Sequence, residues 1–289
     1  MKKFLSLVVI LSILFFSACA EEPLPQLQPV TLSQGASQPQ NIKDNFVPKP
    51  ENYSELSYHD DTIDVKVYHI RRHDTPIVVA FVQIASPDQL RTELARPYPS
   101  QATNRIYEMA KRVNAVLAVN GDWFTYHNRG IAYRNGEKLR SRSDDEYDGL
   151  VIDTNGDFHI MRPMSEENYA SLDTPIMHSF IFGPALVIDG EVQEIVNRKV
   201  TYKQRMAIGQ ISHLSYVLVA TDGPDQNDSV GLNVPQLAQL MKDLGATQAY
   251  NLDGGQSTSI MLGDTKLNGQ NPKRMRAVGD IIYFATGIK

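Results

Sequence analysis

Residues 250–259 read YNLDGGQSTS and end a strand that we expect from Ala246 to Leu252. Before this strand, apolar residues recur at the spacing of an amphipathic helix, and the glycine that follows them suits a left-handed helix end: Leu237, Leu240, Met241, Leu244 and Gly245. The strand finishes in a carboxylate, two glycines and short hydroxyl side chains: Asp253, Gly254, Gly255, Ser257 and Thr258. Bare backbone N–H groups beside a charge suit an oxygen-rich ligand such as a sugar or a phosphate, and a tight turn held by the Asp side chain is the alternative.

A second copy of this layout lies 131 positions earlier in the chain (251 against 120, 253 against 122). Its helical stripe, helix end and strand are formed by Ile106, Met109, Ala110, Val113, Asn114 and the segment from Ala115 to Val119, which leads into Asn120-Gly121-Asp122. Both units therefore close on an Asn-x-Asp sequence. We predict that the two strands lie side by side and bring Asn120, Asp122, Asn251 and Asp253 to one edge of one sheet.

Strand patterns dominate the rest of the chain. They cover Asp64–Ile70, Ile77–Ala85, Leu150–Asp153, Phe158–Met161, Ala185–Ile188, Gln204–Ile211, Ser215–Ala220, Ser257–Leu262 and Ala277–Ala285. Asn155-Gly156 predicts a type I′ hairpin turn, and Asp189-Gly190 repeats the signal. Thr103 and Asn233 are suitable N-caps for the two helices. The fold class that we predict is α+β, a single domain with a large mixed β-sheet, a few helices and flanking hairpins.

The N-terminus has the pattern of an exported protein. Two lysines and a short apolar run in residues 1–18 predict a lipoprotein-type signal peptide, because the run is too brief to span a bilayer comfortably. Cys19, the single cysteine of the chain, is the expected lipidation site, and ordinary secretory cleavage is the alternative. Residues 19–55 are rich in Pro, Gln and Ser and predict a flexible tether; residues 56–289 form the predicted domain.

Composition narrows the class of partner. A net charge of −5 without a basic run argues against nucleic-acid binding. One cysteine excludes an intrachain disulfide, and seven scattered histidines do not form a metal-ligand pattern, so no metal or other cofactor is expected. The expected partners are a glycan substrate and, through the lipid anchor, a membrane, which implies an extracytoplasmic location.

Several motifs occur in the order that is typical of the bacterial phosphodiester glycosidases. These motifs include Asn120-Gly121-Asp122-Trp123-Phe124, Gly183-Pro184-Ala185, Arg205-Met206-Ala207, Thr221-Asp222-Gly223, Asn251-Leu252-Asp253-Gly254-Gly255 and Arg276-Ala277-Val278. The chain thus resembles relatives of the lysosomal uncovering enzyme over most of residues 60–289. The resemblance implies hydrolysis of a sugar-1-phosphodiester, similar to an N-acetylglucosamine-1-phosphodiester, in an exopolysaccharide or another envelope glycan. The family usually has glycine where this chain has Asp122 and Gln256.

Candidate roles follow from the chemistry of that reaction. Asp253 is the expected base or nucleophile, with Asp122 as a possible second carboxylate, and the stereochemical outcome stays open. Arg205, in an otherwise apolar strand, is either a phosphate clamp or a structural ion pair. Arg276 is a second candidate cation or part of a solvated loop, and Asp222 binds sugar hydroxyls or caps a turn.

The other expected substrate contacts are the polar and glycine positions of the two strand ends: Asn120, Asn251, Gly254, Gly255, Ser257 and Thr258. The competing function is a non-catalytic glycan-binding lipoprotein with the same fold. Hydrolysis at phosphorus is a third possibility, but it normally requires a metal cluster.

Overall fold

A computed structural model describes residues 23–33, 45–195, 201–224, 226–269 and 275–288. Its largest sheet has eight strands, in the order β1 (Ser57–Asp60), β2 (Ile63–Arg72), β3 (Thr75–Ile84), β14 (Ser215–Thr221), β13 (Met206–Ser212), β15 (Gln248–Leu252), β11 (Ala185–Ile188) and β12 (Glu191–Val192). A five-stranded sheet has the order β17 (Thr265–Lys266), β16 (Ile260–Leu262), β5 (Leu117–Asn120), β18 (Asp280–Phe284) and β4 (Leu90–Leu94).

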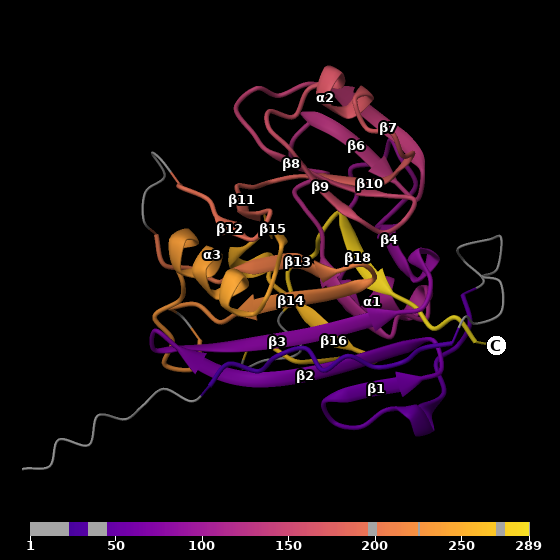
Figure 1. Ribbon diagram of the computed structural model, residues 1–289, viewed down its shortest axis with the longest axis vertical. Coiled ribbons are helices and arrows are strands. Elements are labelled where there is room, and N and C mark those ends of the chain that lie inside the picture. Colours follow the sequence, from indigo (N-terminus) through magenta and orange to yellow (C-terminus); the bar gives the residue numbers. More distant parts are fainter. Residues whose placement is uncertain (1–22, 34–44, 196–200, 225, 270–274, 289) are drawn as a thin grey trace, which may run out of the picture.

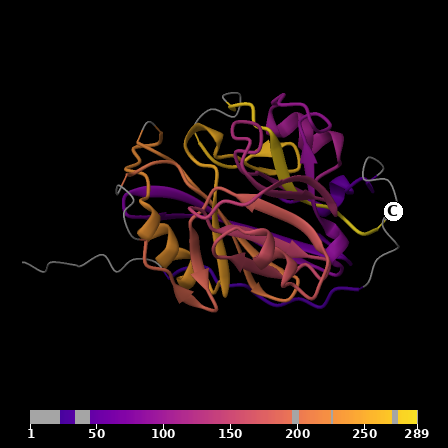
Figure 2. The ribbon, with the colours of Figure 1, turned by 90° about the horizontal axis from the view of Figure 1, so that it is seen from above.

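A smaller part of the molecule lies above this pair of sheets in Figure 1. It contains the three-stranded sheet β10 (Ile176–Ile181), β8 (Gly149–Asp153) and β9 (Phe158–Met161), the hairpin β6 (Gly130–Arg134) and β7 (Glu137–Arg142), and the short helix α2 (Glu166–Ala170). Figure 2 shows the same parts from above.

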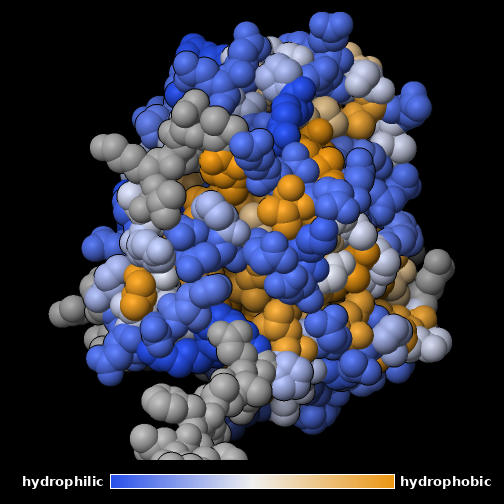
Figure 3. All heavy atoms as spheres, turned by 60° about the vertical axis from the view of Figure 1, so that its left-hand side comes forward, coloured by the Kyte–Doolittle hydropathy of each residue, from blue (hydrophilic) through white to orange (hydrophobic). Residues whose placement is uncertain are grey.

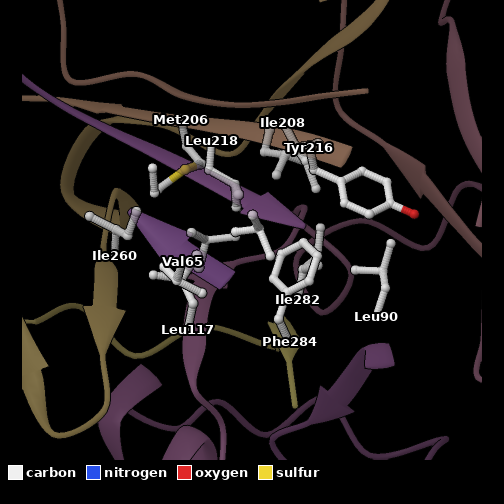
Figure 4. Close-up of a cluster of buried hydrophobic side chains, with 14 of the residues drawn as sticks. Val65, Leu90, Leu117, Met206, Ile208, Tyr216, Leu218, Ile260, Ile282 and Phe284 are labelled. Carbon is white, nitrogen blue, oxygen red and sulfur yellow. The ribbon is translucent and has the colours of Figure 1, made fainter. Parts of the chain in front are cut away.

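The main core fills the space between the two large sheets. Val65, Met206, Ile208 and Leu218 of the eight-stranded sheet meet Leu117, Ile260, Ile282 and Phe284 of the five-stranded sheet (Figure 4). Alternation along each strand sends every second side chain into this layer. The central strands are apolar on their other face as well, because helices cover it: Val79 and Phe81 of β3 belong to the cluster on the α3 side. The sandwich is thus held by burial of the inner faces of both sheets.

Each of the two longer helices covers an outer face. α3 (Val234–Asp243) packs on the eight-stranded sheet, and α1 (Ile106–Arg112) packs on the five-stranded sheet. Asn233 caps α3 as predicted, since its side chain accepts a hydrogen bond from the Gln236 backbone N–H. The predicted helix ends are also confirmed: Gly245 has a φ of +91° and Asn114 a φ of +51°. The N-cap of α1 is Arg105 rather than Thr103.

The sheet prediction requires two corrections. Every strand pairing among the described residues is antiparallel, so the predicted large mixed sheet is replaced by separate antiparallel sheets. The two strands that end in Asn-x-Asp, β5 and β15, belong to different sheets and do not pair side by side. The described residues form a mostly β domain with three α-helices. This agrees with the predicted single domain of strands and a few helices, but the helix content is smaller than the α+β class implies.

The two predicted hairpin turns differ. Asp189 and Gly190 both have positive φ, at +51° and +79°, as a type I′ turn requires. In the other hairpin only Gly156 has a positive φ, at +81°. The Asp153 carboxylate accepts hydrogen bonds from the backbone N–H groups of Asn155 and Asp157 and so stabilises a longer turn. The local Asn-Gly signal was therefore correct for a hairpin but wrong for the turn type.

Part of the predicted tether is packed on the domain. Leu24 and Leu27 lie against the α3 side of the large sheet, and the Val30 backbone N–H donates to Gln83. Asn45 is buried and donates to the Val113 carbonyl. A flexible tether over the whole of residues 19–55 is thus wrong for these segments, because their apolar and amide side chains find partners on the folded domain.

Cys19 and the predicted signal peptide lie outside the described residues. No helix in the described ranges is long and apolar enough to cross a membrane. The face of the molecule shown in Figure 3 is largely hydrophilic, with hydrophobic patches between polar residues.

Candidate active site

The ends of β5 and β15 meet across the two sheets. The Asp253 backbone N–H donates to the Gly121 carbonyl (3.3 Å), and the Asn120 side chain donates to the Asp253 carbonyl (2.8 Å). The same Asn120 side chain accepts a hydrogen bond from the Ser259 backbone N–H (3.1 Å). The two Asn-x-Asp ends are thus brought together as predicted, although backbone contacts between two sheets replace the predicted edge of one sheet.

Asp253 is a partly exposed residue at this junction. Burial raises the pKa of Asp253, and the nearby charge of Asp122 raises it further, whereas the Ser257 hydroxyl and the Arg276 guanidinium lower it. The net shift is upward. A carboxyl group with a raised pKa in a partly open position is a candidate for acid–base work.

The two glycines after Asp253 are needed for different reasons, close contact at Gly254 and a positive φ at Gly255. A Cβ on Gly254 would lie 2.8 Å from the Gln204 carbonyl oxygen, and Gly255 has a φ of +60°. The Gly255 backbone N–H donates to that same carbonyl (2.9 Å). The turn that follows Asp253 therefore packs closely against Gln204, just before β13. A side chain at position 254 would push the turn away from this segment.

Two buried polar atoms next to this turn have no hydrogen-bond partner within the described part of the chain. They are Asn251 Oδ1 and Thr258 Oγ1. The amide nitrogen of Asn251 donates to the Gly183 carbonyl (2.7 Å), which ties the Gly183-Pro184 segment to the site. Unsatisfied polar groups next to a carboxylate are what a ligand-binding or catalytic site leaves open.

Asp122 is placed differently from Asp253. Its carboxylate is buried, accepts a hydrogen bond from the Ile181 backbone N–H (2.8 Å) and forms an ion pair with Arg134 (3.2 Å). Arg134 also pairs with Asp280 (2.7 Å), and the side chains of all three residues are at most 3% exposed. Asp122 thus belongs to a buried Asp122–Arg134–Asp280 cluster beneath Gly121.

Arg134 and Asp280 were not anticipated from the sequence. Burial raises the pKa of Asp280 to about 7 even though Arg134 opposes the shift. A Cβ on Gly121 would lie 2.4 Å from Asp280 Oδ1, so a glycine is required above this carboxyl. The sequence gives one local signal for them: Arg134 ends an apolar strand and Asp280 begins one. A charged residue that is buried in such a place needs a partner of opposite charge.

The guanidinium of Arg205 faces away from open solvent. Its Nε donates to the Leu232 carbonyl (3.0 Å) and its Nη2 to the Thr201 carbonyl (2.6 Å). Asp222 is also engaged, since its carboxylate accepts from the Gly269 backbone N–H (2.9 Å) and from Asn227. In the structure, both side chains hold neighbouring loops.

Arg276 is exposed, and its guanidinium carbon lies 5.0 Å from the centre of the Tyr126 ring. The ring of Trp123, the residue after Asp122, contacts His127, Tyr147 and Phe182, with ring centres 4.2, 5.5 and 5.1 Å away. The buried ring of Phe124 belongs to the interior instead. Arg276 thus supplies positive charge near Asp253, and the partly exposed Trp123 follows Asp122 in the chain.

The described residues contain no group of three His, Cys, Asp or Glu side chains that could hold a metal ion. The side chains described at the junction carry a carboxylate, hydroxyls, amides and a guanidinium group. This set suits acid–base or nucleophilic chemistry on an oxygen-rich ligand.

Comparisons with known proteins give a consistent result. Residues 113–285 match the family model for phosphodiester glycosidases (NAGPA). The fold is similar to the catalytic domain of zebrafish N-acetylglucosamine-1-phosphodiester alpha-N-acetylglucosaminidase, auto-inhibited by its pro-peptide, at 17% identity and a TM-score of 0.62, covering 89% of this chain and 96% of that one. A hypothetical protein from Synechocystis has 16% identity and a TM-score of 0.60, with 78% of this chain and 62% of that chain covered.

A putative exported protein from Burkholderia pseudomallei is also similar in fold, at 15% identity and a TM-score of 0.50, covering 73% of this chain and 74% of that one. The sequence has no match among proteins with curated descriptions. At these identities the solved structures show a shared fold alone, and the family model, which spans more than half of the chain, shows the relationship. This protein belongs to the phosphodiester glycosidase family.

Proposed function

We propose that this protein hydrolyses the glycosidic bond of a sugar-1-phosphodiester and that Asp253 is the carboxylate that acts at C1. The observation that supports this proposal is the difference between three neighbouring carboxylates. Asp253 is partly exposed beside unsatisfied hydroxyl and amide groups, whereas Asp122 and Asp280 are buried against Arg134. Asp253 is therefore the one that a substrate can reach.

The reaction breaks the bond between C1 and the bridging oxygen. The oxygen leaves with the bonding electron pair as part of a phosphomonoester, and the hydroxyl of water is added to C1, so the products are a reducing sugar and a phosphomonoester. Asp253 acts either as a base that takes the proton of this water or as a nucleophile that water later displaces. Both roles need the ionised carboxylate.

A cation is needed to stabilise the leaving phosphate, and Arg276 suits this role. It is exposed, it lowers the pKa of Asp253 through its charge, and a guanidinium can bind two phosphate oxygens at once. Arg205, the phosphate clamp suggested by the sequence, would first have to release the Leu232 and Thr201 carbonyls. We therefore favour Arg276 for the phosphate and Asn251 and the 254–258 turn for the surrounding substrate contacts. The side chains of Asn120 and Asp222 instead hold neighbouring backbone segments.

The expected setting is the cell surface. The signal-like segment and Cys19 support a lipid-anchored protein that acts on an exopolysaccharide or another envelope glycan. Substitution Cys19→Ser should move the protein from the membrane fraction to the soluble fraction. A wild-type protein that is already soluble and has no lipid mass would refute the anchor.

The second candidate function is a non-catalytic glycan-binding lipoprotein. Its specific support is that glycosidases commonly use two carboxylates at one bond, whereas Asp122 is engaged with Arg134 in this chain. Such a protein would bind the glycan through the 251–258 segment without releasing a product.

Product analysis on an aryl or alkyl sugar-1-phosphodiester separates these functions. Release of reducing sugar with phosphomonoester supports the glycosidase, and sugar phosphate with free alcohol indicates hydrolysis at phosphorus. Binding without product supports the glycan-binding module. Asp253→Asn, which is nearly isosteric, should abolish turnover while the thermal melt remains cooperative; turnover close to that of the wild type would remove Asp253 from the reaction.

A further inference from the structure

A cavity of about 140 Å³ lies between the loop after β4 and the loop after β5. Its polar lining comes from Tyr98, Ser100, Gln101, Thr125, His127, Asn128 and Arg140. Since a water molecule takes about 30 Å³ in the liquid, the cavity has room for a small group such as one oxyanion. None of its lining residues in the described chain is a carboxylate.

Arg140 is the fixed positive charge of this cavity. The residue is only 8% exposed, and burial lowers the pKa of its guanidinium group. Nε donates to the Gly130 carbonyl (3.3 Å), and Nη1 donates to the carbonyls of Phe124 (3.2 Å) and His127 (3.0 Å). Nη2 is buried and, among the residues that the structure describes, has no hydrogen-bond partner.

The charge of Arg140 is not neutralised by a direct ion pair within the described residues. The buried carboxylates Asp122 and Asp280 are paired with Arg134, whose guanidinium carbon lies 5.1 Å from the Phe124 ring centre. Arg140 lies 5.0 Å from the same ring centre. Burial lowers the pKa of Arg140, and the nearby charges of Asp122 and Asp280 raise it, so these carboxylates supply part of the compensating charge. A buried guanidinium stays protonated, so the lack of an acceptor at Nη2 among the described residues is the feature that requires an explanation.

A second lining residue points to the same explanation. Thr125 Oγ1 is buried and also lacks a hydrogen-bond partner in the described ranges. The remaining polar lining supplies hydroxyl, amide and imidazole groups, which can donate to an oxyanion. Arg140 and Thr125 both line the cavity, and none of its described lining residues is a carboxylate, so the lining favours negative charge.

We propose that this cavity binds an oxyanion, a phosphate, sulfate or carboxylate group, with Arg140 as its counterion. The anion is either free in solution or a second anionic group of the glycan substrate, because Thr125 follows the Asp122–Phe124 segment directly. The proposal does not require hydrolysis at Asp253. Binding can therefore succeed or fail independently of the proposed function.

The test uses inorganic phosphate as the probe at constant ionic strength, with chloride as the reference salt. Phosphate should raise the melting temperature of the wild-type protein saturably, beyond the effect of chloride. Asn128→Asp places a carboxylate in the cavity as an internal anion, so this variant should melt at the same or a higher temperature without phosphate. Its Kd for phosphate should rise by roughly tenfold or more, because the new carboxylate already forms the charge-assisted hydrogen bond with Arg140.

Arg140→Met should also lose the phosphate response. If that variant does not fold, Asn128→Asp carries the test alone. Lys138→Met is the matched control, because it removes an exposed positive charge from the same strand, β7, and should keep the response. No phosphate effect on the wild type, or an equal effect on wild type and Asn128→Asp, would overturn the proposal.

Two further arms distinguish the sources of the anion. If the substrate supplies it, wild type should prefer a sugar-1-phosphodiester with an added anionic group over a neutral one, and Asn128→Asp should lose that preference. If the anion is free, the preference should be absent while phosphate binding by calorimetry persists. Either result supports an anion at Arg140. The absence of both phosphate binding and substrate preference would refute the proposal.

Discussion

Substitution of Asp280 by asparagine should change how the stability of the protein depends on pH. Burial raises the pKa of the folded Asp280 carboxyl to about 7, from an ordinary value of 3.8. Between these values the unfolded chain has released the proton and the folded chain still holds it. The folded state therefore loses stability as the pH rises from about 4 to about 7. Roughly three pKa units at about 1.4 kcal/mol each give a loss on the order of 4 kcal/mol.

Asparagine cannot ionise and resembles the protonated carboxyl in shape, so this loss should disappear in Asp280→Asn. The free energy of unfolding of the variant, relative to the wild type, should increase by a similar amount between pH 4 and pH 8. Urea unfolding at a series of pH values measures the difference. Asp145→Asn, which changes an exposed carboxylate, is the control and should give a flat difference.

Two results would refute the reasoning. A constant difference between wild type and Asp280→Asn across this range would mean that the buried carboxyl ionises like an exposed one. A variant that loses stability relative to the wild type as the pH rises would mean that the ion pair with Arg134 outweighs the cost of burial.

Three more substitutions test the surroundings of the site. Arg205→Ala removes the hydrogen bonds to the Thr201 and Leu232 carbonyls, of which Leu232 keeps the bond from the Lys203 backbone N–H. It should cost about 1–3 kcal/mol of stability and affect kcat less, as urea midpoints and kinetics would show. Arg276→Ala should move the acid limb of the kcat/KM profile to higher pH, because Arg276 lowers the pKa of Asp253; an unmoved limb would separate the two residues. Gly121→Ala places a Cβ 2.4 Å from Asp280 and should cost about 1–3 kcal/mol, so an unchanged melting temperature would show that the carboxyl moves freely.

The local structure was largely predictable from the sequence. Helical spacing before Asn114 and Gly245, the capping role of Asn233 and the Asp189-Gly190 turn all follow from interactions within a few residues. The repeated Asn-x-Asp ending also predicted that Asn120 and Asp253 come together. These features depend on neighbours along the chain, which a single sequence records directly.

The tertiary structure decided what each side chain meets. β5 and β15 have similar sequences, but their hydrogen-bond partners assign them to different sheets. Asp122 was expected beside the substrate, yet it pairs with Arg134, 12 positions away, which in turn pairs with Asp280, 146 positions further on. Burial and pairing over such separations depend on how the sheets pack, and this packing determines which of the chemically equivalent carboxylates stays open to a ligand.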